Sequence, residues 1–474
     1  MADDLHYLSA TEAIARFKAR TLSPVELVRA VIERAEKVEP RINAFATTSF
    51  ERALEQAEKA EAKYAKPSGR ARSLEGVPLA VKDEAAIRGE CSTSGSLILR
   101  DHIDTETSPV IERLLRAGAI VHARSTAPEF SCATITHSRL WGVTRNPWHP
   151  DYTPGGSSGG SAASLAAGTS TLATGSDIAG SIRIPASCCG VVGFKPPYGR
   201  VPEEPPYNLD FYCHEGPLAR TVADCALMEN VIAGPHPRDS ATLRPKLRIP
   251  PVLRDIAGWR IGYSIDLGYC EVDADVAENT LAAIDVFREL GCEVEEVDLG
   301  WTRATLVAAL NHLGHLFGNL IARELPRHRH LLTDYARAFA EFGQTTSAED
   351  MLDAMSVAGQ MYETLGPVLE RCDALICPTT AIAAIPADHD PAASEVRING
   401  VAVDPMLGWV MTYPFNILSR CPVMSVPSGR ARNGVPTGIQ IVGRTYDDVR
   451  VFRAAAAYER AVGWLDTPAR RPAL

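Results

Sequence analysis

Residues 153–162 read TPGGSSGGSA, and residues 175–185 read GSDIAGSIRIP. Both segments concentrate glycine, which lets main-chain N–H groups approach a ligand closely, and serine, whose hydroxyl becomes a nucleophile once a base removes its proton. The first segment runs directly into AASLAA at 162–167, which favours a helix and excludes a plain flexible linker. The two segments therefore predict main-chain amides and hydroxyls gathered at the start of a helix.

The pattern Gly-x-Ser-x-Gly occurs twice in the first segment, centred on Ser157 and on Ser158. It matches the nucleophile elbow of α/β-hydrolases, but an elbow must follow a strand. The preceding residues 146–154 read NPWHPDYTP, and their prolines exclude a regular interior strand. The Gly-Lys-Ser/Thr ending of a phosphate-binding loop and the glycine spacing of a dinucleotide site are also absent from this segment.

Short apolar strands alternate with helices from residue 77 onward. We expect strands at 77–81, 119–122, 259–263 and 292–297, and helices at 109–117 and 276–290. Alternation of this kind predicts the α/β class, a layered sheet with helices on both faces. Residues 301–371 have a mostly helical pattern and contain His312 and His315, three positions apart. Because no carboxylate accompanies this pair at matching spacing, we predict no metal site there.

The first 66 residues have the pattern of helices. Ser23 and Glu26 form a capping box around Pro24, apolar residues follow at helical spacing, and Pro40 is expected to end that helix. A second helix is expected at 50–64, and the sequence KPSG at 66–69 predicts a loop. We therefore divide the chain into an N-terminal helical segment, 1–66, that packs on a main domain, 67–474.

Composition excludes several classes of function. The 474 residues include 46% hydrophobic and 22% charged residues, as in a globular protein, and the net charge of -10 is spread without a basic stripe for nucleic acid or an anionic membrane. The start, MADDLH, lacks the basic and apolar regions expected of a signal peptide, and no run of about 18 apolar residues occurs. The eleven cysteines are scattered and form no C-x-x-C pair, which fits a reducing cytoplasm.

Several motifs together resemble the amidase signature family. Lys82 lies in GVPLAVKD at 76–83, Ser157 lies between the glycines of the first segment, and Ser181 follows it in GSDIAGSIR. Further matching segments are APEF at 127–130, CGVVGFKP at 189–196, GPLARTVAD at 216–224 and GIQIVG at 438–443. The resemblance covers nearly the whole chain and is weakest at about 300–410. It implies a large mixed twisted sheet covered by helices on both faces, with a catalytic core at about 74–235.

The resemblance also implies a Ser/cis-Ser/Lys catalytic triad. Ser181 would attack the carbonyl carbon, Ser157 would relay the proton through a cis peptide after Gly156, and Lys82 would be the base. The oxyanion would be held by main-chain N–H groups, implied by the resemblance to be those of Ile178, Ala179, Gly180 and Ser181. Alanine stands at Ala179 where the family pattern has glycine, so we expect an oxyanion hole of slightly altered shape.

Supporting roles are implied for neighbouring residues. Asp177 and Arg183 are expected to form an ion pair beside the nucleophile, and Ser131, like Ser157, to contact the substrate. Ser158 is expected either to hydrogen-bond the triad lysine or to cap the helix that follows. An apolar substrate pocket is suggested by Trp141, Leu316, Phe317, Met351, Met355 and Met361, although such residues are also typical of a plain core.

We therefore expect a serine hydrolase that cleaves an amide-type C–N bond through an acyl-enzyme and needs no metal or organic cofactor. Members of this family act on amides, anilides, ureas and carbamates including urethanes, and the sequence does not choose among these small-molecule substrates. We expect substrate choice to lie at about 300–410 and in the loop near residue 130. The sequence does not decide whether the protein forms a homodimer. The alternatives are a glutamine amidotransferase-type subunit that acts in a complex, and a serine hydrolase that uses histidine as its base.

Overall fold

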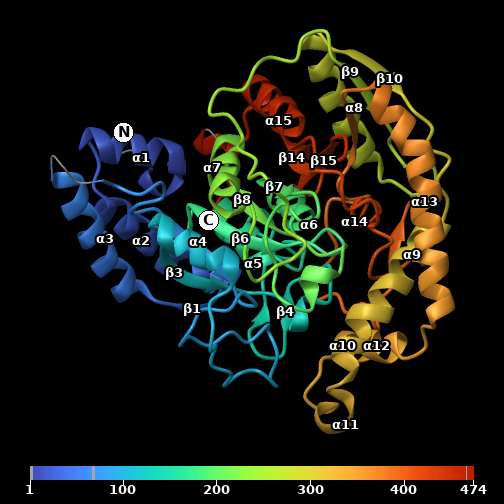
Figure 1. Cartoon of the computed structure of the whole chain (residues 1–474), viewed down its shortest axis with the longest axis horizontal. Helices are drawn as coiled ribbons and strands as arrows, with labels where there is room; N and C mark the ends of the chain where they lie inside the picture. The colour runs from blue at the N-terminus through green and yellow to red at the C-terminus, as the bar shows by residue number, and fades with distance from the viewer. Residues whose placement is uncertain (1–3, 67–69, 466) are drawn as a thin grey trace.

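A mixed sheet forms the centre of the computed structural model, which describes residues 4–66, 70–465 and 467–474 (Figure 1). Within these residues the sheet has 11 strands in the order β1-β3-β2-β6-β8-β7-β14-β15-β11-β9-β10. The strands are β1 Phe45–Thr48, β2 Pro78–Lys82, β3 Ile120–Ser125, β6 Leu172–Ser176, β7 Val192–Lys195, β8 Glu215–Ala219, β9 Arg260–Tyr263, β10 Glu293–Glu296, β11 Ala374–Pro378, β14 Val423–Arg430 and β15 Pro436–Val442. Two short hairpins, β4 (His137–Ser138) with β5 (Gly142–Val143) and β12 (Val396–Ile398) with β13 (Val401–Val403), lie outside it.

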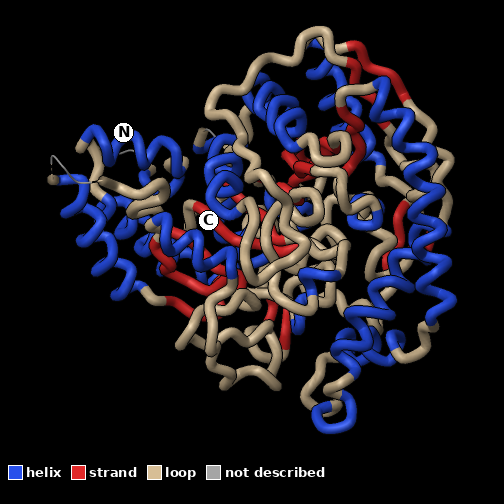
Figure 2. The backbone as a smooth tube through the Cα atoms, viewed as in Figure 1, coloured by secondary structure: helices blue, strands red, loops and turns tan. Residues whose placement is uncertain are grey.

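Parallel pairing occurs towards both ends of the sheet and antiparallel pairing in its middle. β2 runs parallel to β3 and β6, and β9 runs parallel to β10 and β11, whereas β6, β8, β7, β14 and β15 pair antiparallel in succession. Figure 2 shows these strands running through the molecule between helices. The predicted α/β fold with a large mixed sheet is confirmed, as are the four predicted strands to within a few residues.

Helices cover both faces because the strand residues alternate between them. Leu79 and Val81 of β2 face one core, whose helices are α4 (Pro109–Ala117), α7 (Val222–Ile232), α8 (Ala274–Glu289) and α15 (Asp448–Val462). Ala80 faces the other core, with α5 (Gly159–Ala167) and α6 (Arg183–Cys189). The second core is built mainly from alanines, and a Cβ at Gly160 would lie 2.6 Å from the Ala44 carbonyl oxygen. The glycine and alanine run therefore lets α5 lie close to the sheet.

The N-terminal segment contains α1 (Ala10–Ala19), α2 (Pro24–Ile42) and α3 (Phe50–Ala65). The predicted capping box of Ser23 and Glu26 is confirmed, but the prediction that Pro40 ends the helix is wrong. The helix continues through Pro40 to Ile42 and ends at Asn43 in the left-handed conformation. The segment also holds β1, an edge strand paired with β3. Of the loop predicted at 66–69, residues 67–69 lie outside the described residues.

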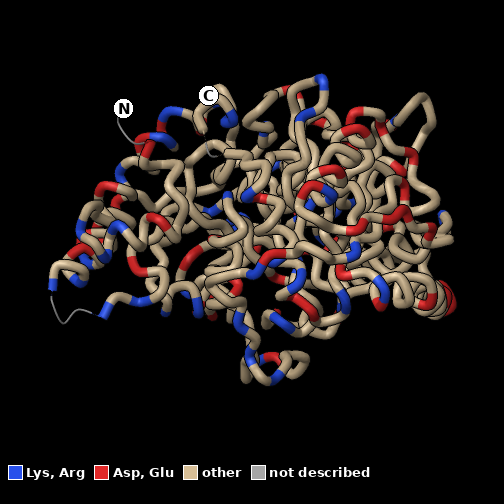
Figure 3. Tube along the Cα trace, turned by 90° about the horizontal axis from the view of Figure 1, so that it is seen from above, with Lys and Arg blue, Asp and Glu red and all other residues tan. Residues whose placement is uncertain are grey.

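The region from 301 to 371 is mostly helical, as the pattern predicted. It contains α9 (Ala304–Leu313), the π-helical turn η4 (Gly314–Gly318), α10 (Asn319–Ala322), α11 (Leu325–His328), α12 (Asp334–Gly343) and the long α13 (Ala348–Arg371), and is followed by α14 (Pro414–Ile417). In Figure 1 α13 runs along the outer edge of the molecule. No helix in the described part of the chain combines the length and apolar character needed to cross a membrane. Figure 3 shows acidic and basic residues interspersed over the molecule.

Candidate active site

Lys82 is buried at the last position of β2, with 1% of its surface exposed. Its Nζ donates to Ser157 Oγ at 2.8 Å and to Ser176 Oγ at 2.9 Å. The main-chain N–H of Lys82 donates to Thr174 Oγ1 of the neighbouring strand β6 at 2.9 Å. Strand pairing therefore sets the position from which the lysine side chain reaches the two hydroxyls.

Ser157 lies on the loop that enters α5, and the peptide bond between Gly156 and Ser157 is cis. Its hydroxyl is buried beside Lys82, and the next residue, Ser158, donates its main-chain N–H to the Ser181 carbonyl at 3.2 Å. The serine segment at 153–162 is thereby joined to the second segment at 175–185. Lys82, Ser157 and Ser181 come together from three separate stretches of the chain.

Asp177 shapes the segment that carries Ser181. It follows β6, and its carboxylate accepts the main-chain N–H of Gly180 at 2.9 Å and that of Ile182 at 3.2 Å. The predicted ion pair with Arg183 is present, with Arg183 Nη2 2.9 Å from Asp177 Oδ1 and both side chains fully buried. Burial alone would raise the pKa of the Asp177 carboxyl, but the Arg183 guanidinium and the hydrogen bonds hold it well below its usual range.

The loop between Asp177 and Arg183 presents only some of the predicted oxyanion donors. The Gly180 N–H was predicted to be an oxyanion donor, but in the structure it donates to the Asp177 carboxylate. Within the described residues, no protein acceptor is recorded for the main-chain N–H groups of Ile178, Ala179 and Ser181. The Ala179 carbonyl accepts a hydrogen bond from the Thr412 hydroxyl at 2.6 Å. Three N–H groups are therefore available to a ligand oxygen.

Glu84 is a site residue that the sequence reasoning missed. Its carboxylate lies 2.9 Å from Lys82 Nζ, accepts the Ser176 hydroxyl at 2.5 Å and also accepts the Ser131 hydroxyl. It lies in the turn after β2, where the Ala85 N–H donates to the Lys82 carbonyl at 3.0 Å, and the only signal in the sequence is a carboxylate two positions after the lysine. Ser176, which contacts both Lys82 and Glu84, was likewise missed, because one serine among several in a glycine-rich segment carries no distinguishing signal.

Ser131, expected to contact the substrate, lines the cavity beside Ser157, whereas Ser158 acts in neither of the predicted ways. Ser131 reaches Glu84 from a loop in which Phe130 and Ser131 both have positive φ, 51° and 56°. Such conformations are costly for residues other than glycine and persist where the surroundings enforce them. Ser158 Oγ donates to the Ser176 carbonyl at 3.4 Å, neither capping α5 nor replacing Ser176 as the partner of Lys82. The role expected for Ser158 is therefore corrected.

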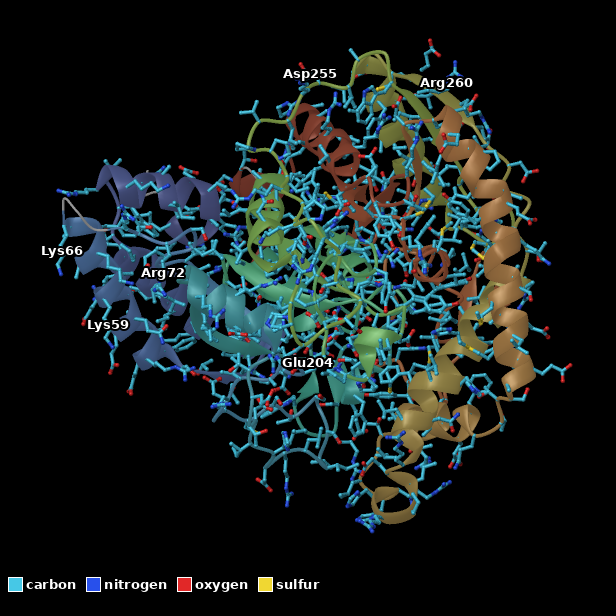
Figure 4. All side chains as sticks on the ribbon, in the orientation of Figure 1. Lys59, Lys66, Arg72, Glu204, Asp255 and Arg260 are labelled. Atoms are coloured by element: carbon cyan, nitrogen blue, oxygen red, sulfur yellow. The ribbon has the colours of Figure 1, made fainter. Side chains whose placement is uncertain are left out.

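Two adjoining cavities open on either side of these residues. One, of about 160 Å³, is lined by Ser157 and Ile178 and by five acidic side chains, Glu84, Asp177, Glu203, Glu204 and Glu215. The other, of about 30 Å³, is apolar and is lined by Ala179 and Ser181 together with Cys132, Ala133, Leu313, Phe339, Met406 and Leu407. Figure 4 labels Glu204 near the middle of the molecule, far from Lys59 and Lys66 at the edge of the N-terminal segment.

Phe317 lines both cavities and comes from the π-helical turn η4 in the variable helical region. Single π-helical turns are frequent at functional sites. Of the other apolar residues suggested for the pocket, Leu316 and Met355 are exposed, Met361 is core, and Trp141 donates Nε1 to Asp83 at 3.0 Å. Of the six suggested residues, Phe317 alone lines these two cavities, because helical periodicity does not tell a cavity wall from a core or an outer face.

His312 and His315 face different partners. His312 Nε2 lies 2.8 Å from Asp210 Oδ1 and its ring stacks on Tyr212, whereas His315 Nδ1 lies 3.2 Å from Thr346 Oγ1. Across the described residues, no group of three or more His, Cys, Asp or Glu side chains is arranged to hold a metal ion.

Comparisons with known proteins identify the family. A family model described as Amidase matches residues 26–452. The acylamidase of Rhodococcus erythropolis is 33% identical over 470 residues, which are 98% of this chain and 97% of that protein. A glutamyl-tRNA(Gln) amidotransferase subunit of Geobacter metallireducens is 33% identical over 97% of this chain and 98% of its own length.

The fold comparison agrees with the sequence comparisons. The crystal structure of a bacterial aryl acylamidase of the amidase signature family superimposes with a TM-score of 0.91 at 32% identity, covering 99% of this chain and 100% of that chain. The chain therefore belongs to the amidase signature family of amide hydrolases. The resemblance inferred from the sequence motifs is confirmed.

Proposed function

We propose that this protein hydrolyses an amide-type C–N bond of a small molecule, using Ser181 as nucleophile, Ser157 as proton relay and Lys82 as base. The observation that carries the proposal is the 2.8 Å contact between Lys82 Nζ and Ser157 Oγ, on a loop joined by hydrogen bond to Ser181. A base within hydrogen-bond reach of a hydroxyl is the first requirement of nucleophile activation.

The chemistry would proceed through an acyl-enzyme. Ser181 Oγ bonds to the carbonyl carbon while its proton passes to Ser157 and the proton of Ser157 passes to the neutral Lys82 amine. The tetrahedral oxyanion accepts hydrogen bonds from the N–H groups of Ile178, Ala179 and Ser181. The C–N bond then breaks as the leaving nitrogen takes a proton returned from Lys82 through Ser157. Water attacks the ester by the same proton route, which releases the acid and restores Ser181.

The two cavities, which share Ser131, Ile178 and Phe317 in their walls, support a substrate with two unlike halves. The apolar cavity next to Ala179 suits a small hydrocarbon group, and the larger one with its carboxylic acids suits a polar group. Amides, anilides, ureas and carbamates all meet this description, and the similarity to an acylamidase favours amides and anilides. No metal or organic cofactor takes part in the proposed steps.

A second candidate function follows from the similarity to the glutamyl-tRNA(Gln) amidotransferase subunit, which is as close in sequence as the acylamidase. In that case the chain would be one component of a complex. Size-exclusion chromatography and a glutamine assay on the purified chain separate the two functions. Release of ammonia from glutamine only after partner proteins are added would favour the second.

The proposal is tested with a serine-directed fluorophosphonate probe and peptide mapping. We expect the label on Ser181, and we expect Ser181→Ala to abolish both labelling and hydrolysis. Label on another serine would overturn the assignment of the nucleophile. A panel of amides, anilides, ureas, carbamates and esters, ranked by kcat/KM, then defines the substrate class.

A further inference from the structure

Lys82 is surrounded by acceptors in this structure. Its Nζ lies within hydrogen-bond distance of Ser157 Oγ, Ser176 Oγ and Glu84 Oε1, at 2.8, 2.9 and 2.9 Å. An ammonium group has three N–H donors and no acceptor, and each of these three oxygens can accept one of them. A protonated lysine would hold Ser157 in place but would have no lone pair with which to receive its proton.

Glu84 provides the negative charge that stabilises this state. Burial alone would raise the pKa of the Glu84 carboxyl, but the Lys82 ammonium and the hydrogen bonds from Ser131, Ser176 and Lys82 lower it below its usual range. Glu84 is therefore ionised at neutral pH. The two serine hydroxyls fix both of its oxygens, Oε1 by Ser176 and Oε2 by Ser131, so the carboxylate has one orientation.

The other acids near the lysine are less able to supply charge. Burial and repulsion from neighbouring carboxylates, including Glu84, raise the pKa of Glu203 to about 8 and that of Glu215 well above its usual value. Burial also raises the pKa of Glu204. Asp83 is turned towards Thr93 and Trp141, and Asp177 is paired with Arg183. Glu84 is thus the carboxylate that contacts Lys82 and stays charged.

We propose that Glu84 is a positioning residue that aligns Lys82 with Ser157 and, through its charge, sets the pH above which Lys82 can accept a proton. The inference rests on the proposed function, in which Lys82 is the base. A negative charge in contact with an amine favours its ammonium form, so removing the charge while keeping the shape should let the reaction proceed at lower pH.

The test uses the second-order rate constant for inactivation by the fluorophosphonate probe, measured from pH 5 to pH 10, because it needs no knowledge of the substrate. We expect Glu84→Gln to move the acidic limb of this profile to lower pH by about 1–3 units. Glu84→Ala removes the alignment as well and should lower the maximal rate by about 10²-fold. Glu84→Asp keeps the charge but shortens the side chain, so its limb should stay near that of the wild type while its maximal rate falls.

A matched control is Glu293→Gln, which removes a carboxylate paired with Arg260 at 3.3 Å on the exposed strands β9 and β10. Arg260 is labelled at the far end of the molecule in Figure 4. This variant should have the wild-type profile. If Glu84→Gln shows only a lower rate with an unmoved acidic limb, Glu84 is merely structural and the inference is wrong. If Glu84→Gln does not fold, the test depends on Glu84→Asp. A shift of its acidic limb away from the wild-type position would then overturn the inference.

A second readout follows the lysine itself. The sequence contains 8 lysines. This number is small enough for each side chain to be resolved by NMR of protein that carries ¹³C-labelled lysine. The Lys82 signal, assigned by its loss in Lys82→Arg, should titrate at lower pH in Glu84→Gln than in the wild type. Failure of the proposed function would give a different result. The probe would still label Ser181→Ala, or it would react with Lys82→Ala at the wild-type rate, whatever the pH profile of Glu84→Gln.

Discussion

Asp177 and Arg183 form a two-armed ion pair beneath the nucleophile loop, with Arg183 Nε 3.0 Å from Asp177 Oδ2 and Nη2 2.9 Å from Oδ1. The remaining polar atoms of the pair are used too. Arg183 donates to the Gln440 and Asn416 side chains, each at 2.6 Å, and Asn416 donates to Asp177 Oδ1 at 2.8 Å. This network connects the loop before α6 to β15 and to α14, far along the chain.

Replacing Asp177 by Asn should unfold or loosen this loop. Breaking a buried pair leaves the Arg183 charge without its partner, which costs about 3–5 kcal/mol in the free energy of unfolding. Because the pKa of Asp177 is lowered in the folded state, the loss should be fully present above about pH 4 and shrink as the pH falls below it. Urea denaturation across pH measures this. Asp285→Asn, at an exposed pair with Arg288, is the control, and an equal loss there would contradict the prediction.

Gly180→Ala should remove activity although it adds one methyl group. Gly180 has a φ of 122°, and a Cβ there would lie 1.9 Å from Thr412 Oγ1 and 2.4 Å from Thr412 Cβ. The loop must therefore move, and misplacing oxyanion donors typically costs about 10²–10³ in kcat. The control is Gly258→Ala, at a φ of 79° with no atom within 4 Å of the added Cβ. Wild-type kcat in Gly180→Ala would contradict the role assigned to this loop.

Lys82→Arg should keep the positive charge and abolish catalysis. An arginine stays protonated at working pH and cannot accept the proton of Ser157. We expect kcat/KM to fall by about 10²–10⁴, the usual contribution of a general base. Steady-state hydrolysis of the best substrate in the panel measures it. The same exchange at the exposed Lys246 should leave kcat/KM unchanged, and an active Lys82→Arg enzyme would rule out Lys82 as the base.

Lys195 should make stability depend on pH. Burial, together with the nearby Arg183 charge, lowers the pKa of Lys195 to about 7, and its Nζ donates to the carbonyls of Cys421, Pro196 and Ser419 at 2.9, 3.2 and 3.3 Å. An unfolded lysine has a pKa of about 10.4, so between about pH 7 and pH 10 the unfolded state binds more protons and the free energy of unfolding rises with pH.

The contribution is isolated by comparing the wild type with Lys195→Met, because cysteine and tyrosine side chains titrate in the same range. The wild-type minus variant difference in the free energy of unfolding should increase by up to about 4 kcal/mol between pH 7 and pH 10. Chemical denaturation at several pH values measures it. Parallel curves for the two proteins would show that Lys195 does not titrate in this range.

Much of the fold was predictable because its signals are local. The capping box of Ser23 and Glu26, the helix Pro109–Ala117 and the apolar strand that ends at Lys82 depend on residues that are neighbours in sequence. The continuation of α2 through Pro40 and the edge strand β1 were not predicted. Pro40 lacks the N–H that would bond the carbonyl four residues earlier, so local rules predict a helix end there, yet the helix runs two residues further. An edge strand of four residues has too short a pattern to recognise.

The sequence alone determined which residues carry the proposed chemistry, since Lys82, Ser157 and Ser181 lie in motifs with a recognisable order. The tertiary structure decided how they are held. It brought Glu84 and Ser176 to Lys82, and it turned the Gly180 N–H towards Asp177 rather than towards a ligand. The direction of an N–H group and the contacts between distant segments depend on the packing of the whole chain, and no local pattern encodes them.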